Sequence, residues 1–312
     1  QTKIPGVGVQ SDQKIVQDAI HTYLNVFDSG NLPEKRQVAF YGGSFTGLSI
    51  QRQKLLLDAV RPWIESGKIH SIRVSTHSLL VNNQNILLLR ENNVRIVELG
   101  IQSTNNKVLD AVGRPCNFDT VRSAVNSIRK NGLGLGLQLM PGLPEDNESI
   151  FMQSVHDVIG LEPDFVRIYP TLVIKNTDLY EMYNSGSYVP WSLERMIQLV
   201  KNALKAFKKF DISVIRVGLH ADPSMLENLV DGPYHPSFRY LVESRIARDR
   251  MFDLIESLPE IPSTISFRVP SRHVSLFLGH KKDNISAIKS RYGIRNILIQ
   301  QIGNLEDLQL VA

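Results

Sequence analysis

The stretch that decides the fold spans residues 94–143 and reads VRIVELGIQSTNNKVLDAVGRPCNFDTVRSAVNSIRKNGLGLGLQLMPGL. Its first apolar run, residues 96–101, ends at the polar pair Gln102-Ser103, and two short helical patterns follow. A second apolar run, residues 133–140, breaks at a proline and a glycine. This order of strand, polar loop, helix and strand predicts a βαβ unit with parallel strands.

Polar side chains lie at or near the ends of these two strands, where parallel sheets bind their ligands. They are Gln102, Ser103, Arg114 and Gln138. An arginine can hold a carboxylate with two hydrogen bonds, and a glutamine can pair with ribose hydroxyls or an amide. Gln138 interrupts an apolar strand and therefore needs a polar partner. Considered by itself, Arg114 is at least as well explained as an exposed charge at a helix end as it is by a carboxylate-binding role.

The same alternation of strands and helices extends along most of the chain. Further apolar runs predict strands at residues 37–41, 70–75, 165–169 and 213–217, with helices between them. Residues 11–27 have helical spacing, with Ser11 as the expected N-cap. Strands recurring about every 30 residues are typical of a (β/α) barrel. The strands from Gln37 onward are too few to close an eight-stranded barrel, so we predict a partial barrel whose first strand is not visible.

The regular alternation of strands and helices stops near residue 220, so we predict that the chain has three parts. Residues 1–220 form the partial barrel, residues 221–258 a helical connector, and residues 259–312 a small basic α+β domain. We expect the connector to be helical from residue 223 to residue 258.

The composition excludes some classes of protein and leaves others open. The chain has 312 residues, of which 42% are apolar and 21% charged, as in ordinary globular proteins. No apolar run approaches the roughly 20 residues that cross a bilayer, so no membrane partner is expected. The single cysteine excludes an internal disulfide framework and fits a reducing, cytoplasmic compartment. A net charge of +4 favours an anionic partner only weakly, and a mildly basic cytosolic enzyme fits equally well.

A second group of candidates follows other predicted strands. Tyr41 leads into Gly42-Gly43-Ser44, where paired glycines would let backbone amides approach a ligand, although such a pair alone is more often a tight turn. Arg167 and Tyr169 place polar side chains on a later strand, as Gln138 does on an earlier one.

Four motifs together resemble the radical S-adenosylmethionine superfamily. They are YGGSFTGL at residues 41–48, ELGIQS at 98–103, QLMPGLP at 138–144 and RIYPTLVIKNT at 167–177. The nearest resemblance is to the radical domain of the Elongator catalytic subunit and its short bacterial relatives, over residues 1–245. It implies a partial (β/α)6 barrel that binds S-adenosylmethionine across the strand ends.

The resemblance also implies roles for individual residues. The loop Gly42-Gly43-Ser44 would meet the methionine amino group of the cofactor. By similarity to oxygen-independent coproporphyrinogen oxidases, which share the ELGIQS-type loop, Gln102 and Arg114 would contact its ribose and carboxylate, with Ser103 alongside. Gln138 would reach the ribose, and apolar residues around Met140 and Leu143 would flank the adenine. Substrate contacts would come from residues around the expected cavity: His77, Arg167, Tyr169, Arg216 and His220. No residue is predicted to be catalytic.

The sequence departs from this family at the iron–sulfur cluster. A 4Fe–4S cluster in a radical enzyme is held by three thiolates, commonly in a CxxxCxxC loop after the first strand. The one cysteine, Cys116, cannot hold it, and we interpret Cys116 as incidental. We therefore expect no metal site in this chain, a cluster on an upstream segment absent from it, and no activity without that segment. A descendant that has lost the cluster is the alternative. A further departure is Ser75-Thr76-His77-Ser78, where relatives carry an Arg-Pro-Asp-like run, so His77 is either a substrate contact or a packed strand-end histidine.

The last part of the chain carries a different signal. Residues 278–285, LGHKKDNI, look like the Gly-x-x-Gly turn of a KH RNA-binding domain with Lys282 in place of the second glycine. In KH domains this turn holds the backbone of single-stranded nucleotides. Phosphate contacts would come from Lys281, Lys282, Lys289, Arg291 and Arg295. A solvated basic helix face remains the alternative.

These features predict a radical S-adenosylmethionine enzyme that modifies tRNA or rRNA. Reductive cleavage of the cofactor would give a 5′-deoxyadenosyl radical, with flavodoxin or ferredoxin as the reductant. The residues after His220 contain no acetyl-CoA pyrophosphate loop, so the whole of Elongator's chemistry is not expected. A cluster-free RNA-binding protein that keeps the barrel as a scaffold is the alternative, and methyl transfer without radicals ranks last. The substrate and the oligomeric state stay open.

Overall fold

The computed structural model describes residues 9–26, 35–114, 116–219, 223–303 and 305–311. The chain divides into two compact units, each described by itself. The first comprises Gln1–Arg167 with Lys209–Ile215, and the second Ile168–Lys208 with Arg216–Ala312. Among the described residues, no helix is both long enough and apolar enough to span a membrane.

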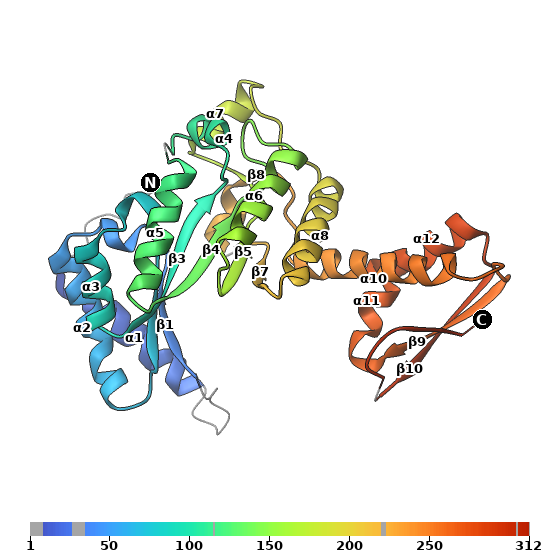
Figure 1. Ribbon diagram of the computed structural model, residues 1–312, viewed down its shortest axis with the longest axis horizontal. Coiled ribbons are helices and arrows are strands. Elements are labelled where there is room, and N and C mark those ends of the chain that lie inside the picture. Colours follow the sequence, from blue (N-terminus) through green and yellow to red (C-terminus); the bar gives the residue numbers. More distant parts are fainter. Residues whose placement is uncertain (1–8, 27–34, 115, 220–222, 304, 312) are drawn as a thin grey trace. The chain divides into compact units, whose positions relative to one another are not determined.

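A parallel six-stranded sheet in the order β1-β2-β3-β4-β5-β7 forms a partial α/β barrel. Its strands are β1 (Gln37–Phe40), β2 (Ser71–Thr76), β3 (Val94–Gln102), β4 (Gly134–Leu139), β5 (Phe165–Ile168) and β7 (Ser213–Val217). The helices of this part are α1 (Val9–Val26), α2 (Ile50–Glu65), α3 (Asn83–Glu91), α4 (Asn106–Ala111), α5 (Phe118–Lys130) and α6 (Glu148–Gly160). The predicted strands and the predicted fold class are thus confirmed, and Figure 1 shows α5 and α6 over strands β3 to β5.

The two faces of the sheet differ in chemistry because successive side chains point to opposite sides. On the helix-covered face, Val97 and Leu99 of β3 and Leu137 of β4 are buried, while α3 packs on β3 and α5 on β4. Each such side chain contributes about 1.5–3 kcal/mol by leaving water. The opposite face carries Glu98 and Gln138, with glycines between them. The polar face is therefore the one on which a site can form.

Side-chain caps begin the helices that follow the strands. Asn82, Asn105, Asn117 and Asn147 each accept a hydrogen bond from a backbone N–H in the first turn of α3, α4, α5 and α6. Each cap satisfies a donor that would otherwise have no partner. The predicted cap at Ser11 was wrong: α1 begins at Val9, so Ser11 lies inside its first turn.

The second unit begins with a small antiparallel pair, β6 (Val173–Ile174) and β8 (Leu229–Asp231). Its helices are α7 (Asp178–Asn184), α8 (Leu193–Lys209), α9 (Pro223–Asn228) and α10 (Phe238–Glu256). The prediction of continuous helix from residue 223 to 258 was therefore wrong in its middle. Gly232 has φ +119°, and a Cβ there would lie 3.2 Å from the Thr171 carbonyl, so the chain turns at a position that only glycine tolerates well.

The C-terminal part of this unit, residues 264–311, forms a three-stranded sheet with helices (Figure 1). Its elements are β9 (Thr264–Pro270), α11 (Val274–Leu278), α12 (Asp283–Tyr292), β10 (Asn296–Ile302) and β11 (Gln309–Val311). The strand β9 is central, with β10 parallel on one side and β11 antiparallel on the other. Met251 and Ile255 of α10 share one apolar core with Phe267 and Ile288, so α10 packs as part of this α+β arrangement.

Candidate active site at the strand ends

The C-terminal end of β3 contains a bulge that redirects Gln102. The pairing of β3 with β4 shifts register between Gly100 and Gln102, and Gln102 has φ +65°. A left-handed backbone at a residue other than glycine costs on the order of 1–3 kcal/mol, and such strain gathers at functional sites. Gln138 Nε2 donates to Gln102 Oε1 at 3.1 Å, and Met140 N donates to the Gln102 carbonyl at 2.9 Å. Three residues predicted to share a site therefore do lie together.

Arg114 joins this group from the end of α4. Its Nη2 donates to the Gly100 carbonyl at 2.9 Å, while its buried Nε has no hydrogen-bond partner among the described residues. Burial lowers the pKa of Arg114 from its ordinary value. A Cβ at Gly100 would lie 2.8 Å from Gln102 Nε2, so the glycine leaves room for the glutamine. A buried guanidinium nitrogen with an unsatisfied donor fits an anionic ligand that the protein alone does not supply.

The loop after β1 is open to a ligand. Gly42 has φ +98°, and a Cβ added at Gly42 or Gly43 would meet no atom of the described residues within 4 Å. The Ser44 carbonyl accepts from Gly47 N at 2.9 Å, which begins a short 3-10 helix and closes the loop. The space beside the two glycines leaves their backbone groups accessible, and their contact with a ligand stays a prediction.

Two further predicted residues have structural partners. Ser103 Oγ lies 3.3 Å from Ser154 Oγ of α6 and accepts from Asn105 N, so its hydroxyl is engaged away from the glutamine pair. His77 Nδ1 accepts from Leu79 N at 3.1 Å and caps the turn after β2. Burial, and then the charge of Arg114, lower the pKa of His77. The cap agrees with the packed strand-end alternative, and the predicted ligand contacts of both residues stay predictions.

A buried ionic cluster lies on the same polar face of the sheet and was not predicted. Glu98 is 3% exposed; its Oε1 accepts from Tyr41 Oη at 2.6 Å and from Arg73 Nη1 at 3.0 Å. Its Oε2 lies 2.9 Å from Arg167 Nε, and Arg167 Nη2 donates to Tyr41 Oη at 2.6 Å. Gly136 of β4 makes room, because a Cβ there would lie 2.8 Å from Glu98 Cγ. The sequence did contain a signal for this cluster: Glu98 is an acidic residue inside an apolar strand, and a buried charge needs a partner.

This cluster defines the state of Tyr41. Burial, and then the hydrogen bond to Glu98, raise the pKa of Tyr41 from 10 to about 12. The phenol therefore stays protonated at neutral pH and donates to the carboxylate. Arg167, predicted as a substrate contact, has its guanidinium engaged with Glu98 and Tyr41, and its role toward a substrate stays a prediction.

The remaining predicted substrate residues belong to the second unit or lie outside the described residues. Tyr169 and Arg216 are half-buried in the second unit. His220 lies outside the described residues. Their roles stay predictions.

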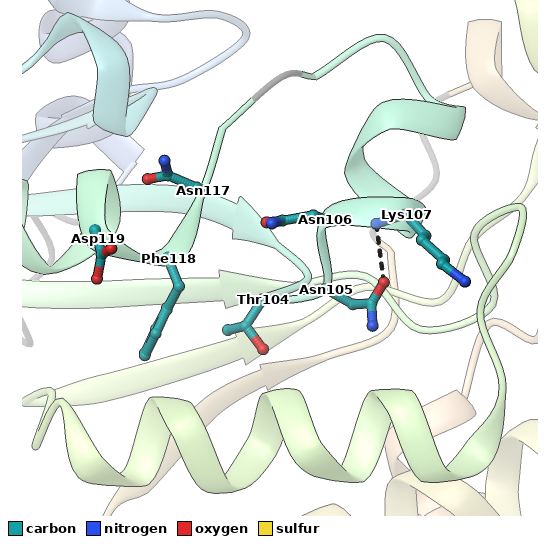
Figure 2. A pocket seen from close by; sticks show the side chains of 7 residues that line it. All are labelled: Thr104, Asn105, Asn106, Lys107, Asn117, Phe118 and Asp119. Atoms are coloured by element: carbon teal, nitrogen blue, oxygen red, sulfur yellow. Dashed lines mark hydrogen bonds between the residues drawn. The ribbon is translucent and has the colours of Figure 1, made fainter.

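A polar pocket of about 400 Å³ lies beside the first turns of α4 and α5. Figure 2 shows Asn106 and Lys107 on the α4 side and Phe118 and Asp119 on the α5 side, with Asn105 Oδ1 accepting from Lys107 N. Its described lining includes none of the predicted site residues. The pocket therefore does not coincide with the glutamine–arginine group.

The described residues offer polar groups to a small ligand but no set of thiolates for an iron–sulfur cluster. The open glycine loop, the buried Arg114 Nε and the paired glutamines can hydrogen-bond a polar or anionic ligand. A cluster needs three thiolates, whereas Cys116 is the only cysteine of the sequence. No group of three or more His, Cys, Asp or Glu side chains in the described part of the chain could hold a metal ion. Burial raises the pKa of Cys116, which disfavours its thiolate.

Comparison with known proteins identifies the family and the fold. The profile of the radical SAM superfamily matches residues 13–158, and that of the radical SAM C-terminal domain matches residues 163–248. The chain is 32% identical over 117 residues to a tRNA uridine(34) acetyltransferase of Methanocaldococcus jannaschii, covering 36% of this chain and 22% of that protein. It is 28% identical over 111 residues to Elongator complex protein 3 of Homo sapiens, covering 35% of this chain and 20% of that protein. It thus spans less than a quarter of the length of these relatives.

Solved structures share the fold. An archaeal Elp3 from Methanocaldococcus infernus with an N-terminal deletion superposes with a TM-score of 0.65 at 23% identity, covering 77% of this chain and 59% of that one. Coproporphyrinogen III oxidase from Escherichia coli, a radical SAM enzyme, superposes with a TM-score of 0.51 at 16% identity, covering 65% of this chain and 46% of that one. Two consecutive radical SAM profiles and a shared partial barrel establish that this chain belongs to the radical S-adenosylmethionine superfamily, with Elongator-like relatives.

Proposed function

We propose that this chain is the cofactor-binding and RNA-binding part of a radical S-adenosylmethionine enzyme that modifies RNA. The observation that carries the proposal is the convergence of Gln102, Gln138 and Arg114 at one strand edge, where Arg114 Nε is buried and has no hydrogen-bond partner in the described part of the chain. Family membership supports S-adenosylmethionine as the ligand.

Each residue would have a defined part in holding the cofactor. The Arg114 guanidinium would pair with the carboxylate, because it keeps its charge and has a donor to offer. The amides of Gln102 and Gln138 would hydrogen-bond the ribose hydroxyls, and the Gly42-Gly43-Ser44 backbone would receive the amino group. In this superfamily the bound cofactor supplies, with a reduced 4Fe–4S cluster, a radical that abstracts hydrogen from the substrate.

The cluster ligands would come from outside this sequence, since Cys116 is its only cysteine. The barrel residues alone then bind and orient the cofactor, and turnover requires the added thiolates and a reductant such as flavodoxin or ferredoxin. The single cysteine also favours a second candidate function, an RNA-binding protein that keeps the barrel without redox chemistry.

The RNA part of the proposal rests on the C-terminal turn and on the relatives named as tRNA uridine(34) acetyltransferases. The turn Gly279–Lys282 joins α11 to α12 between the parallel strands β9 and β10. Lys281 and Lys282 have φ of 51° and 64°, so lysine here adopts the conformation that the second glycine of a Gly-x-x-Gly turn provides. Both side chains are exposed and available to phosphates.

Calorimetric titration with S-adenosylmethionine tests the cofactor site. We expect Arg114→Met to weaken binding by about 10- to 100-fold, since a hydrogen bond to a charged group contributes about 1.5–3 kcal/mol. Binding of 5′-methylthioadenosine, which lacks the amino acid part, should stay unchanged in the same variant. Arg122→Met removes an exposed arginine of α5 and serves as the control. If the wild type does not bind, or if both ligands lose affinity equally, the assignment of Arg114 is wrong.

Fluorescence anisotropy with single-stranded RNA at several salt concentrations tests the C-terminal turn. We expect Lys281→Glu/Lys282→Glu to weaken binding and to reduce the slope of log affinity against log salt by about 1–2 units. The double variant Lys14→Glu/Lys54→Glu makes the same change of charge at exposed positions of α1 and α2. An equal loss in both double variants would show only a general effect of charge. RNA binding without S-adenosylmethionine binding would support the cluster-free alternative.

A further inference from the structure

Tyr41 combines exposure with a fixed hydroxyl group. The residue is 49% exposed, although its hydroxyl donates to Glu98 and accepts from Arg167, each at 2.6 Å. A surface tyrosine normally moves among rotamers, whereas two short bonds to charged partners hold this ring in one orientation. The ring therefore presents a fixed apolar surface to solvent.

The partners of the ring lie on one side of it. The guanidinium carbon of Arg167 is 4.9 Å from the Tyr41 ring centroid, a cation–π distance. Arg167 is in turn held by its ion pair with buried Glu98. Because one side of the ring is packed against a cation and about half of the residue is still exposed, we infer that the exposed part includes the ring surface turned away from Arg167.

Tyr41 also lies next to the proposed cofactor site. It directly precedes Gly42-Gly43, and its hydroxyl reaches Glu98, which shares the polar face of the sheet with Gly100 and Gln138. A flat group placed on the Tyr41 ring would lie at the same strand-end edge as the glycine loop.

We propose that the exposed face of Tyr41 is the stacking surface for a planar heteroaromatic base of the substrate. The inference rests on the proposed function only in taking RNA as the substrate. Stacking of a nucleobase on an aromatic side chain needs a fixed ring with an open face, and it tolerates any base. The Glu98–Arg167 pair is then a positioning device for the ring, because it keeps the ring from turning edge-on to the base.

The test compares two oligonucleotides of equal charge on the full chain. Dissociation constants are measured for a single-stranded oligouridylate and for an abasic ribose-phosphate oligomer of the same length, so that phosphate contacts cancel in their ratio. We expect Tyr41→Leu to reduce the preference for the base-containing strand by about tenfold. Tyr41→Phe and Tyr41→Trp keep an aromatic ring but lose the hydroxyl that fixes it, so each should keep part of the preference, with a loss clearly smaller than that of Tyr41→Leu. Tyr23→Leu removes a comparably exposed tyrosine, 41% exposed on α1, and should change nothing.

Several outcomes of these measurements would overturn the inference. An unchanged preference in Tyr41→Leu would remove the stacking surface, and an equal loss in Tyr41→Phe would assign the effect to the hydroxyl instead of the ring. If Tyr41→Leu does not fold, a complete loss of the preference in the folded Tyr41→Trp variant overturns the inference. Loss of the preference on adding saturating S-adenosylmethionine to the wild type would assign the ring to the cofactor's adenine. Failure of the wild type to bind S-adenosylmethionine would refute the proposed function but leave the oligonucleotide ratio as a valid test.

Discussion

Replacing Glu98 by glutamine should destabilise the barrel far more than losing a surface charge. Glu98 is 3% exposed, and the side chains of its partners Arg73 and Arg167 are only 18% and 16% exposed. Removing one member of such a buried pair typically costs about 3–5 kcal/mol, because the remaining charges stay desolvated without a counterion. Glutamine keeps the shape and one acceptor, but its NH2 group would face a guanidinium donor. We therefore expect a loss of about 3–5 kcal/mol in the free energy of unfolding.

Urea denaturation followed by far-ultraviolet circular dichroism measures this loss. With a denaturant slope of about 1–3 kcal/mol per molar, the midpoint should fall by at least about 1 M. The control is Asp58→Asn, which breaks the exposed pair with Arg61, whose side chains are 47% and 53% exposed; it should cost at most about 1 kcal/mol. Equal losses in the two variants would refute the reasoning, since they would show that solvent screens the Glu98 cluster like a surface pair.

A second variant distinguishes the cost of leaving two buried arginines unpaired from the net contribution of the whole cluster to the free energy of unfolding. Replacing Glu98, Arg73 and Arg167 together by apolar residues of similar volume removes all three charges at once. Because no charge is then left buried alone, we expect this triple variant to be more stable than Glu98→Gln. A triple variant less stable than Glu98→Gln would mean that the cluster contributes net stability.

Three further predictions concern other positions. The pKa of Tyr41 is about 12 in the folded protein against 10 in the unfolded chain, so its contribution to stability is complete below pH 10 and is lost as the pH rises toward 12. In an alkaline absorbance titration, Tyr41→Phe should remove one phenol that ionises late, while Tyr292 should remain as another. Gly100→Ala should displace the Gln102 side chain, because the new Cβ would lie 2.8 Å from Gln102 Nε2. We expect the variant to lose about 1–3 kcal/mol of stability and to bind S-adenosylmethionine more weakly. An unchanged affinity in calorimetry would contradict this prediction. Lys282→Gly should relieve the strain of a left-handed φ of 64° and raise the free energy of unfolding of the C-terminal core by about 0.5–1 kcal/mol, seen as a higher thermal midpoint. The same variant should bind RNA more weakly. A lowered midpoint would show that the turn carries no strain.

The sequence alone determined the order of the barrel elements. Apolar runs bounded by glycine, proline and polar residues fixed β1 to β5 and β7, because strand and helix periods are local properties of the chain. It also brought Gln102, Arg114 and Gln138 into one expected site, since the ends of neighbouring parallel strands meet at one edge. Helix ends were less certain: α1 begins two residues before the predicted cap, and Gly232 interrupts the predicted connector with a turn.

Only the tertiary structure revealed the Glu98 cluster and the fixed ring of Tyr41. Tyr41 and Arg167 are separated by 126 positions in the chain, and no local pattern indicates that they meet. Their contact depends on how β1, β3 and β5 are placed in the sheet and on the space that Gly136 leaves between them. Periodicity shows which face of a strand a side chain occupies, but the partner of a buried charge is chosen by the packing of distant strands, and that is known only once the chain has folded.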